Sequence, residues 1–313
     1  MNILITGGCG NLGSRLLMPL IQRGDRVVLF DLQRRPRIDS PQFARCQFVA
    51  GDLADADALL HAVGAHEVQS IFHLGAILSA DAEDRPQDAW AANMIGTRNV
   101  LEAARRSGAR QVVFSSTVAT YGANLPEPLA QDAPQWPLSL YGACKVAGER
   151  LGFYYEQRFG LDFRAVRFPA VVGPQGASGG ASAFVSALFK EAVGNGQYTF
   201  YLEPSTRCPL VYVADAVAGL VKLHEALKAK LTRNVYNVAG WAPSAQELAS
   251  LVAARLPEAI FRYEPDPLQN AIVNSWPDQI DDRVAREDWG WDAQYDLDRM
   301  ADEMIRVLGG RPG

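Results

Sequence analysis

The stretch NILITGGCGNLG, residues 2–13, decides the fold of this chain. Asn2–Thr6 is a run of strand-forming residues, and helical periodicity follows over Leu12–Arg23. Between them, glycines recur in the pattern G-x-x-G-x-x-G, whose positions serve a tight turn, a close approach of the backbone to a pyrophosphate, and close helix–strand packing. The helix start adds free N–H groups and the positive end of a dipole. The pattern predicts a dinucleotide site at Gly7, Gly10, Asn11, Leu12 and Gly13.

Strand and helix patterns alternate through the first half of the chain. Further strands are predicted at Arg26–Phe30, Gln47–Ala50, Ser70–Leu74, Gln111–Phe114 and Phe163–Phe168. The intervening helices are predicted near Asp55–Val63, Pro86–Ser107 and Leu140–Phe159. Such alternation indicates a parallel sheet covered by helices on both faces, so we predict an α/β chain with a doubly wound Rossmann sheet.

The pattern changes after Phe168. Val171–Gly180 is rich in glycine and predicts a loop, and Val235–Val238 is one more candidate strand of the main sheet. Helical periodicity returns at Ala183–Val193, at Val213–Lys230, at Ala245–Arg255 and in a last helix ending near Leu308. We expect an NAD-binding Rossmann domain over 1–170, to which 211–240 returns. Residues 171–210 and 241–313 are expected to form a smaller C-terminal substrate-binding lobe.

Composition narrows the class of protein. The chain has 313 residues and a formal net charge of −5, which gives no reason to expect nucleic acid as a partner. It contains no apolar run long enough to span a bilayer and no visible secretory signal, so we expect a cytoplasmic protein without a membrane partner. The four cysteines lack the spacing of metal ligands, so we expect reduced thiols and no metal.

The acid that follows the second strand predicts the cofactor. A carboxylate at Asp31 can accept hydrogen bonds from a ribose hydroxyl and would repel a 2′-phosphate. Arg34 and Arg35 follow and are candidates for holding such a phosphate. The position of Asp31 matches the ribose contact, so NAD is favoured over NADP.

Small and polar residues follow the third and fourth strands. Asp52 and Leu53 come after the third strand, where an Asp can contact the adenine, and Leu74, Gly75 and Ala76 come at the end of the fourth. Small residues there let a cofactor lie across the strand ends. We expect all five to line the cofactor site.

A tyrosine and a lysine four residues apart predict the chemistry. Tyr141 and Lys145 open the Leu140–Phe159 helix and share one of its faces. A nearby ammonium and the positive nicotinamide ring favour the phenolate and should lower the tyrosine pKa from its usual value near 10. Thr117 follows the fifth strand, and its hydroxyl can position a substrate oxygen. We predict Thr117, Tyr141 and Lys145 as catalytic, with Tyr141 and Lys145 also touching the cofactor.

These elements resemble the extended short-chain dehydrogenase/reductases, the NAD-dependent epimerase/dehydratase family, over nearly the whole chain. The matching stretches are the Gly-rich turn, Asp31, Gly51-Asp52-Leu53, His73-Leu74-Gly75-Ala76, Asn93 with Gly96-Thr97, Ser115-Ser116-Thr117, Tyr141 with Lys145, and Arg167-Phe168-Pro169. The resemblance implies that Asn93, which supports the active-site framework in the family, joins the cofactor site with Ser115, Phe168 and Val171.

Within that family, the chain looks most like the short-chain-type L-threonine 3-dehydrogenases. The sugar dehydratases have an acid pair after the catalytic threonine, whereas here Thr117 is followed by Val118-Ala119. The sugar 4-epimerases usually have an asparagine after the strand-six run, whereas here Phe168 is followed by Pro169-Ala170. The resemblance implies oxidation of a secondary hydroxyl of a small molecule, L-threonine to 2-amino-3-ketobutyrate. It also implies substrate contacts from Ser79, Thr117, Tyr141, Ser182 and Trp276, and a homodimer paired through the 86–107 and 140–159 helices.

One departure leaves the substrate open. Threonine dehydrogenases of this type have a Thr-Thr-Asp-Tyr-like run where this chain has Ala181-Ser182-Ala183-Phe184. That stretch is closer to the erythronate-type sugar-acid dehydrogenases. A sugar-acid dehydrogenase and a nucleotide-sugar 4-epimerase therefore remain alternatives, as does a catalytically inactive NAD-sensing protein. The intact Thr117, Tyr141 and Lys145 set argues against the last.

Overall fold

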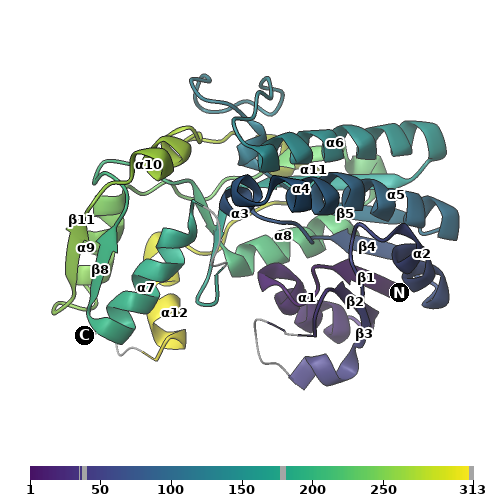
Figure 1. Cartoon of the computed structure of the whole chain (residues 1–313), viewed down its shortest axis with the longest axis horizontal. Coiled ribbons are helices and arrows are strands. Elements are labelled where there is room, and N and C mark those ends of the chain that lie inside the picture. Colours follow the sequence, from purple (N-terminus) through teal and green to yellow (C-terminus); the bar gives the residue numbers. More distant parts are fainter. Residues whose placement is uncertain (35, 37–40, 177–180, 310–313) are drawn as a thin grey trace.

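The computed structural model describes residues 1–34, 36, 41–176 and 181–309. Some residues that the sequence-based predictions cover therefore lie outside the described part. They are Arg35, the end of the glycine-rich loop at 177–180, and residues 310–313 of the C-terminal lobe. Figure 1 shows a larger part built on a sheet and a smaller part beside it, formed mainly by later segments of the chain. Within the described residues, no helix is both long and apolar enough to cross a membrane.

The larger part is built on a parallel sheet, as the alternating pattern predicted. Within the described residues its strands are β1 (Asn2–Thr6), β2 (Arg26–Asp31), β3 (Gln47–Ala50), β4 (Ser70–His73), β5 (Gln111–Thr117), β6 (Asp162–Phe168) and β10 (Val235–Asn237). Their order across the sheet is β10-β6-β5-β4-β1-β2-β3. Each neighbouring pair is parallel. The late strand β10 thus returns to the sheet beside β6.

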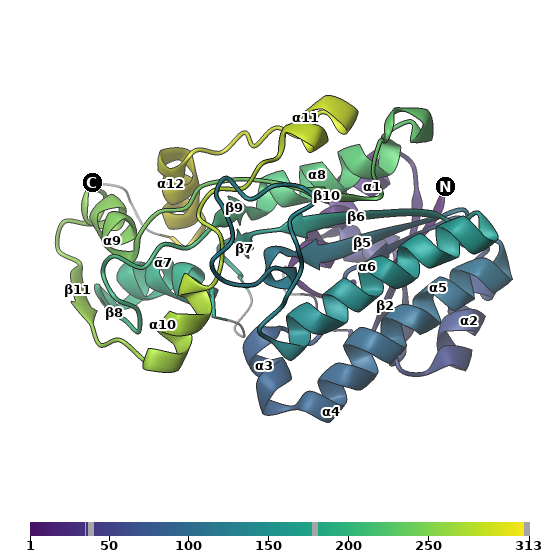
Figure 2. The same cartoon turned by 90° about the horizontal axis from the view of Figure 1, so that it is seen from above.

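Helices cover both faces of this sheet, as Figure 2 shows from above. One face carries α2 (Ala56–Ala65), α5 (Gly96–Ser107) and α6 (Leu140–Phe159). The other carries α1 (Asn11–Gln22), α8 (Val213–Glu225) and α11 (Arg283–Trp289). The predicted α/β Rossmann fold is therefore confirmed.

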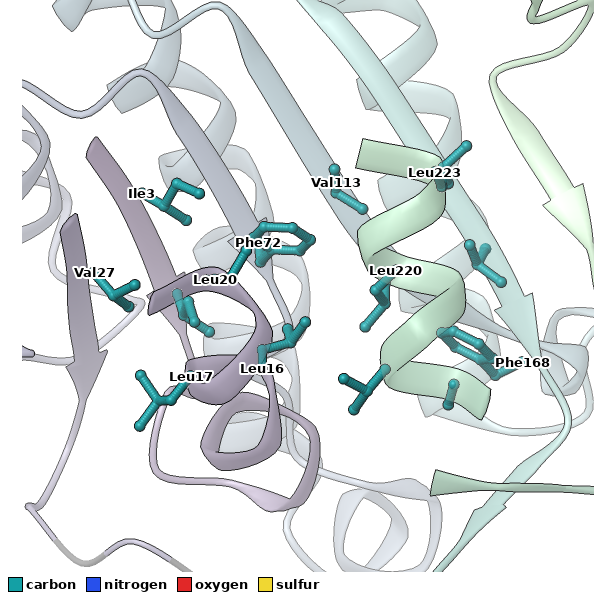
Figure 3. Close-up of a cluster of buried hydrophobic side chains, with 14 of the residues drawn as sticks. Ile3, Leu16, Leu17, Leu20, Val27, Phe72, Val113, Phe168, Leu220 and Leu223 are labelled. Carbon is teal, nitrogen blue, oxygen red and sulfur yellow. The ribbon is translucent and has the colours of Figure 1, made fainter. Parts of the chain in front are cut away.

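The strands are apolar on both sides because both sides are buried. Successive residues of a strand point to opposite faces, so Ile3 and Leu4 of β1 enter different cores. Figure 3 shows one of these cores, where Ile3, Phe72 and Val113 of three strands face α1 and α8. This packing fixes the strand register, and with it the position of every residue at the strand ends.

The predicted Pro86–Ser107 helix is present over its whole length, but its hydrogen-bond pattern changes within it. Short helices α3 (Ser79–Asp84) and α4 (Pro86–Ala89) come first, then a π-helical turn, η2 (Trp90–Ile95), and then α5. In the described part of the chain, short 3₁₀-helices also occur at η1 (Pro41–Arg45), η3 (Val118–Thr120) and η4 (Lys228–Lys230). A π-helical turn inside an α-helix is frequent at functional sites.

The smaller part has its own apolar core. Its elements are α7 (Ala183–Asn195), β8 (Gln197–Phe200), α9 (Ala245–Ala253), β11 (Ile260–Tyr263), α10 (Pro267–Asn274) and α12 (Leu297–Val307). A further strand pair, β7 (Ala170–Val172) with β9 (Leu210–Tyr212), connects the two parts. β7 lies in a stretch predicted as loop, because a three-residue strand beside Gly and Pro leaves no periodic signal.

The strand order reverses between β1 and β4, since β2 and β3 extend to one side and β5, β6 and β10 to the other. In open α/β sheets, ligands bind outside the carboxyl ends of the strands at such a reversal point.

Candidate active site

A cleft of about 670 Å³ lies at this reversal point and extends towards the smaller part. Nearly all the residues that the sequence predicted as site residues line it. They are Gly7, Gly10, Asn11, Leu12, Gly13, Asp31, Asp52, Leu53, Leu74, Gly75, Ala76, Ser79, Ser115, Thr117, Tyr141, Lys145, Phe168, Val171, Ser182 and Trp276. Segments from all along the chain therefore meet in one cavity.

The glycine-rich turn packs so closely that side chains are excluded. Gly7 has a φ of +65°, and a Cβ there would lie 2.7 Å from the Cα of Gly75 in the turn after β4. A Cβ on Gly13 would lie 2.5 Å from the carbonyl oxygen of Gly7. Among the described residues no side chain caps the start of α1, so its first N–H groups remain available to an anion. This cradle fits a dinucleotide pyrophosphate.

Asp31 is held at the rim of this cradle. Its Oδ2 accepts a 2.9 Å hydrogen bond from the Cys9 amide in the glycine-rich turn, and its Oδ1 accepts a 2.8 Å bond from the Leu32 amide. A carboxylate oxygen can accept more than one hydrogen bond, so Asp31 keeps acceptor capacity towards the cleft. Its fixed negative charge suits a free ribose diol and opposes a phosphate.

The predicted catalytic pair lies at the start of α6. Ser139 caps the helix by accepting a 3.1 Å bond from the Gly142 amide. A Cβ on Gly142 would lie 2.2 Å from the carbonyl oxygen of Ala119, so only glycine lets α6 approach the chain after β5 this closely. This contact brings Tyr141 to the same cleft as Thr117.

Lys145 is buried beneath the cleft. Its Nζ donates a 2.6 Å hydrogen bond to the Ser115 carbonyl oxygen and lies 4.4 Å from the centre of the Phe114 ring. It is 5.6 Å from the centre of the Tyr141 ring. Burial lowers the pKa of Lys145 to about 7, although Cys144 and Glu149 oppose the shift.

The pKa of Tyr141 departs from the sequence expectation. We expected Lys145 and the positive nicotinamide together to lower it; in the protein alone, burial raises it above its usual value. Removing the phenol from water penalises its charged form. The same burial lowers the pKa of Lys145, which weakens the help that its ammonium gives to the phenolate. A further positive charge in the cleft is needed to favour the phenolate.

A buried ion pair under α6 was not among the predicted site residues. Glu149 and Arg167 are buried and lie 2.7 Å apart, from Oε2 to Nη2. Ser116, which lines the cleft together with Ser115 and Thr117, donates a 2.5 Å bond to Oε1 of the same carboxylate. Glu149 therefore links the helix that carries Tyr141 to the strand end that carries Thr117. Its position four residues after Lys145, on the same helical face, was the available signal.

Asn93 does not line the cleft. It lies in the π-helical turn, where its side chain accepts a 2.8 Å bond from the Ile77 amide and donates one of 2.8 Å to the Ile77 carbonyl. Ile77 itself lines the cleft. Asn93 thus fixes the backbone after β4, which agrees with the expected framework role.

Three separate segments line the part of the cleft where we expect the substrate to bind. Ser79 begins α3, Ser182 precedes α7, and Trp276 follows α10. α3 is tied to α6 because the Glu83 carboxylate accepts a 2.8 Å bond from the Leu140 amide.

Several residues that line this cavity were not predicted from the sequence. Ser186 follows Ser182 by one helical turn, a spacing that could have identified it. Arg85 and Asp88 also line the cleft, with no motif to mark them. Among the described residues, no cluster of His, Cys, Asp and Glu could hold a metal ion.

Comparison with known proteins places this geometry in a family. The model of the NAD-dependent epimerase/dehydratase family matches residues 3–239. The mitochondrial L-threonine 3-dehydrogenase of Bos taurus is 35% identical over 311 residues, which cover 98% of this chain and 82% of that protein.

Solved structures show the same relationship. A monomeric L-threonine 3-dehydrogenase from a metagenome superposes with a TM-score of 0.90 at 30% identity, over 98% of both chains. The UDP-glucose 4-epimerase of Thermus thermophilus, in complex with NAD, superposes with a TM-score of 0.87 at 26% identity, over 99% of both chains. Since the family match spans most of the chain and the threonine dehydrogenase likeness spans nearly all of it, the chain belongs to the NAD-dependent epimerase/dehydratase family, the extended short-chain dehydrogenase/reductases.

Proposed function

We propose that this protein is an NAD-dependent dehydrogenase that oxidises the secondary hydroxyl of a small substrate, with L-threonine as the first candidate. The observation that carries the proposal is the meeting of Thr117, Tyr141 and Lys145 in the same cleft as the glycine-rich turn and Asp31. The likeness to L-threonine 3-dehydrogenases in both parts of the chain supports the choice of substrate.

In the proposed mechanism, Tyr141 accepts the proton of the substrate hydroxyl. The Thr117 hydroxyl orients the substrate oxygen, and Lys145 fixes the strand end and faces the cofactor ribose. NAD, when bound, supplies the hydride acceptor and a positive nicotinamide ring. A positive charge near Tyr141 lowers the pKa of its phenol, which offsets the effect of burial.

The residues proposed to bind NAD and those proposed to bind the substrate line different parts of the cleft. The glycine-rich turn and Asp31 would bind the pyrophosphate and adenine ribose. Ser79, Ser182 and Trp276 would bind the substrate, the two serines by hydrogen bonds and the indole by covering its apolar part.

A second candidate has its own support. Ser182, Ala183 and Ser186 line the substrate end, so the start of α7 offers hydroxyls and no acid. Hydroxyls suit a polyhydroxy acid such as erythronate better than the ammonium group of an amino acid. A nucleotide-sugar 4-epimerase is a third candidate, since one such enzyme shares the fold over nearly the whole chain.

A substrate panel tests the proposal. The purified protein is given NAD with L-threonine, D-erythronate or UDP-galactose, and NADH is followed at 340 nm. Sustained NADH formation with L-threonine is expected. Turnover only with erythronate would make the protein a sugar-acid dehydrogenase, and conversion of UDP-galactose without net NADH would make it an epimerase. Bound NAD without turnover of any substrate in a wider panel of small hydroxy acids would contradict the proposal.

A further inference from the structure

A segment of the larger part reaches across and holds the chain beside Trp276. This segment lies between η3 and α6, and in Figure 1 it is the blue-green loop above the start of α6. The Glu127 carboxylate accepts two backbone hydrogen bonds there, at 2.9 Å from the Asp278 amide and 3.1 Å from the Gln279 amide. Each of its two oxygens therefore accepts one hydrogen bond, from two successive residues that lie just after Trp276.

Leu129 continues the same connection through its backbone. Its amide donates a 2.8 Å bond to the Gln279 carbonyl, and its carbonyl accepts a 3.0 Å bond from the Asp281 amide. Its side chain is fully buried in a small apolar cluster with Val118, which follows Thr117 and lines the cleft. The segment Glu127–Leu129, which we name the 127–129 clamp, is thus anchored at the end of the catalytic strand.

Trp276 lies between two fixed points. Its amide donates a 3.1 Å bond to the Val273 carbonyl at the end of α10, and its side chain packs against the core of the smaller part. Pro277 follows, and its ring restricts the backbone. Asp278, the next residue, is the first residue that the 127–129 clamp holds. The backbone beside Trp276 therefore has little freedom while Glu127 holds Asp278 and Gln279.

We propose that Glu127 is a positioning residue that holds Trp276 over the substrate end of the cleft. This inference rests on the proposed function, because it assigns Trp276 to substrate binding. Glu127 lies outside the cleft lining and acts through the backbone of Asp278 and Gln279. Loss of its carboxylate should weaken substrate binding and leave the glycine-rich turn and NAD affinity unchanged.

Hydrogen exchange tests the clamp without any substrate. Glu127→Ala removes both acceptors and Glu127→Gln at least one, because its amide nitrogen cannot accept. Asp132→Asn is the matched control, since Asp132 is an exposed carboxylate of the same loop. In the NAD-bound protein, the amides of Trp276 and of residues 278–281 should exchange faster in Glu127→Ala, by less in Glu127→Gln, and at the wild-type rate in Asp132→Asn. Equal exchange in all four proteins would overturn the clamp.

A double-mutant cycle tests whether Glu127 acts through Trp276. With the substrate found in the panel, Glu127→Ala should raise KM about tenfold, as expected for two lost bonds to an ionised acceptor at an exposed site, with kcat changed by roughly twofold or less. In a Trp276→Ala background, the same change should cause no further loss. An additive loss, or a loss confined to kcat, would overturn the positioning role. If no substrate is turned over, the proposed function fails while the exchange result still decides the clamp.

Discussion

The Lys145 ammonium donates a 2.6 Å hydrogen bond to the Ser115 carbonyl, and so joins the catalytic helix to the strand that ends in Thr117. The bond is buried and lies beside the cleft. Together with the Ser116–Glu149 bond, this bond fixes the spacing between the two elements that carry the proposed base and the proposed hydroxyl donor.

This relationship predicts a double defect for Lys145→Ala. The variant should lose turnover by at least about 100-fold, because the positive charge and the link between helix and strand disappear together. Its NAD affinity, measured by calorimetry, should also fall. Lys190→Ala, which changes an exposed lysine of α7, serves as the control and should behave like the wild type. Wild-type NAD affinity in Lys145→Ala would refute a cofactor role for Lys145.

Asp31 predicts the choice between NAD and NADP. The wild-type protein should prefer NAD strongly, because a fixed carboxylate repels a 2′-phosphate. Asp31→Asn keeps the size of the side chain and removes the charge, so it should narrow the ratio of kcat/KM for NAD over NADP. The exposed Asp57→Asn should leave that ratio unchanged. Equal use of the two cofactors by the wild-type protein would show that Asp31 does not discriminate.

The two buried histidines predict loss of stability in mild acid. His73 lies between the hydroxyls of Thr6 and Thr97, at 2.7 Å and 2.9 Å, and burial lowers its pKa to about 3. Burial likewise lowers the pKa of His224 to about 4. Below pH 6.5 these histidines become protonated in the unfolded chain but stay neutral in the folded chain. The free energy of unfolding therefore falls as the pH decreases from 6.5.

Below pH 6.5, each such histidine lowers the free energy of unfolding by up to about 1.4 kcal/mol per pH unit. Urea unfolding at pH 7.5, 6.5 and 5.5 should show the decline, and His73→Asn should make it shallower. The exposed His61→Asn should not alter the slope. A slope in His73→Asn equal to that of the wild type would mean that His73 is protonated in the folded protein.

An exposed apolar patch predicts self-association. Trp90, Phe153 and Tyr154 are about half exposed on η2 and α6. Ala89 and Leu101, two apolar residues of the 86–107 helix, are buried within the chain and do not belong to this surface. We expect a homodimer by light scattering at micromolar concentration and a monomer for Tyr154→Arg. Leu268→Arg, at an even more exposed apolar position on α10, should remain dimeric. A monomeric wild-type protein, like the similar metagenomic enzyme, would contradict this.

The sequence predicted the sheet well because its strands carry strong local signals. β1 and β3 have the predicted bounds, and so does α6, since apolar runs and periodicity both end sharply there. β7, β8, β9 and β11 were not predicted, because these short strands lie outside the regular strand–helix alternation that marks the strands of the main sheet.

Prediction of the site succeeded where residues follow strands and failed where contacts cross between distant segments. The glycine-rich turn, Asp31 and Tyr141 follow from position in a motif. The ties from Glu127 to Asp278 and from Glu149 to Ser116 do not, because they join segments whose proximity only the folded chain reveals. The pKa of Tyr141 was likewise missed, since the extent of burial cannot be read from a four-residue spacing.

The central claim is that Tyr141 accepts the substrate proton, and Tyr141→Phe tests it most directly. The change removes one oxygen and retains the ring, so the cleft and its NAD affinity should be preserved. Turnover of the substrate found in the panel, followed as NADH at 340 nm with NAD affinity measured on the same sample, should fall by about 100-fold or more. Tyr141→Phe that binds NAD normally and retains most of its turnover would contradict the account.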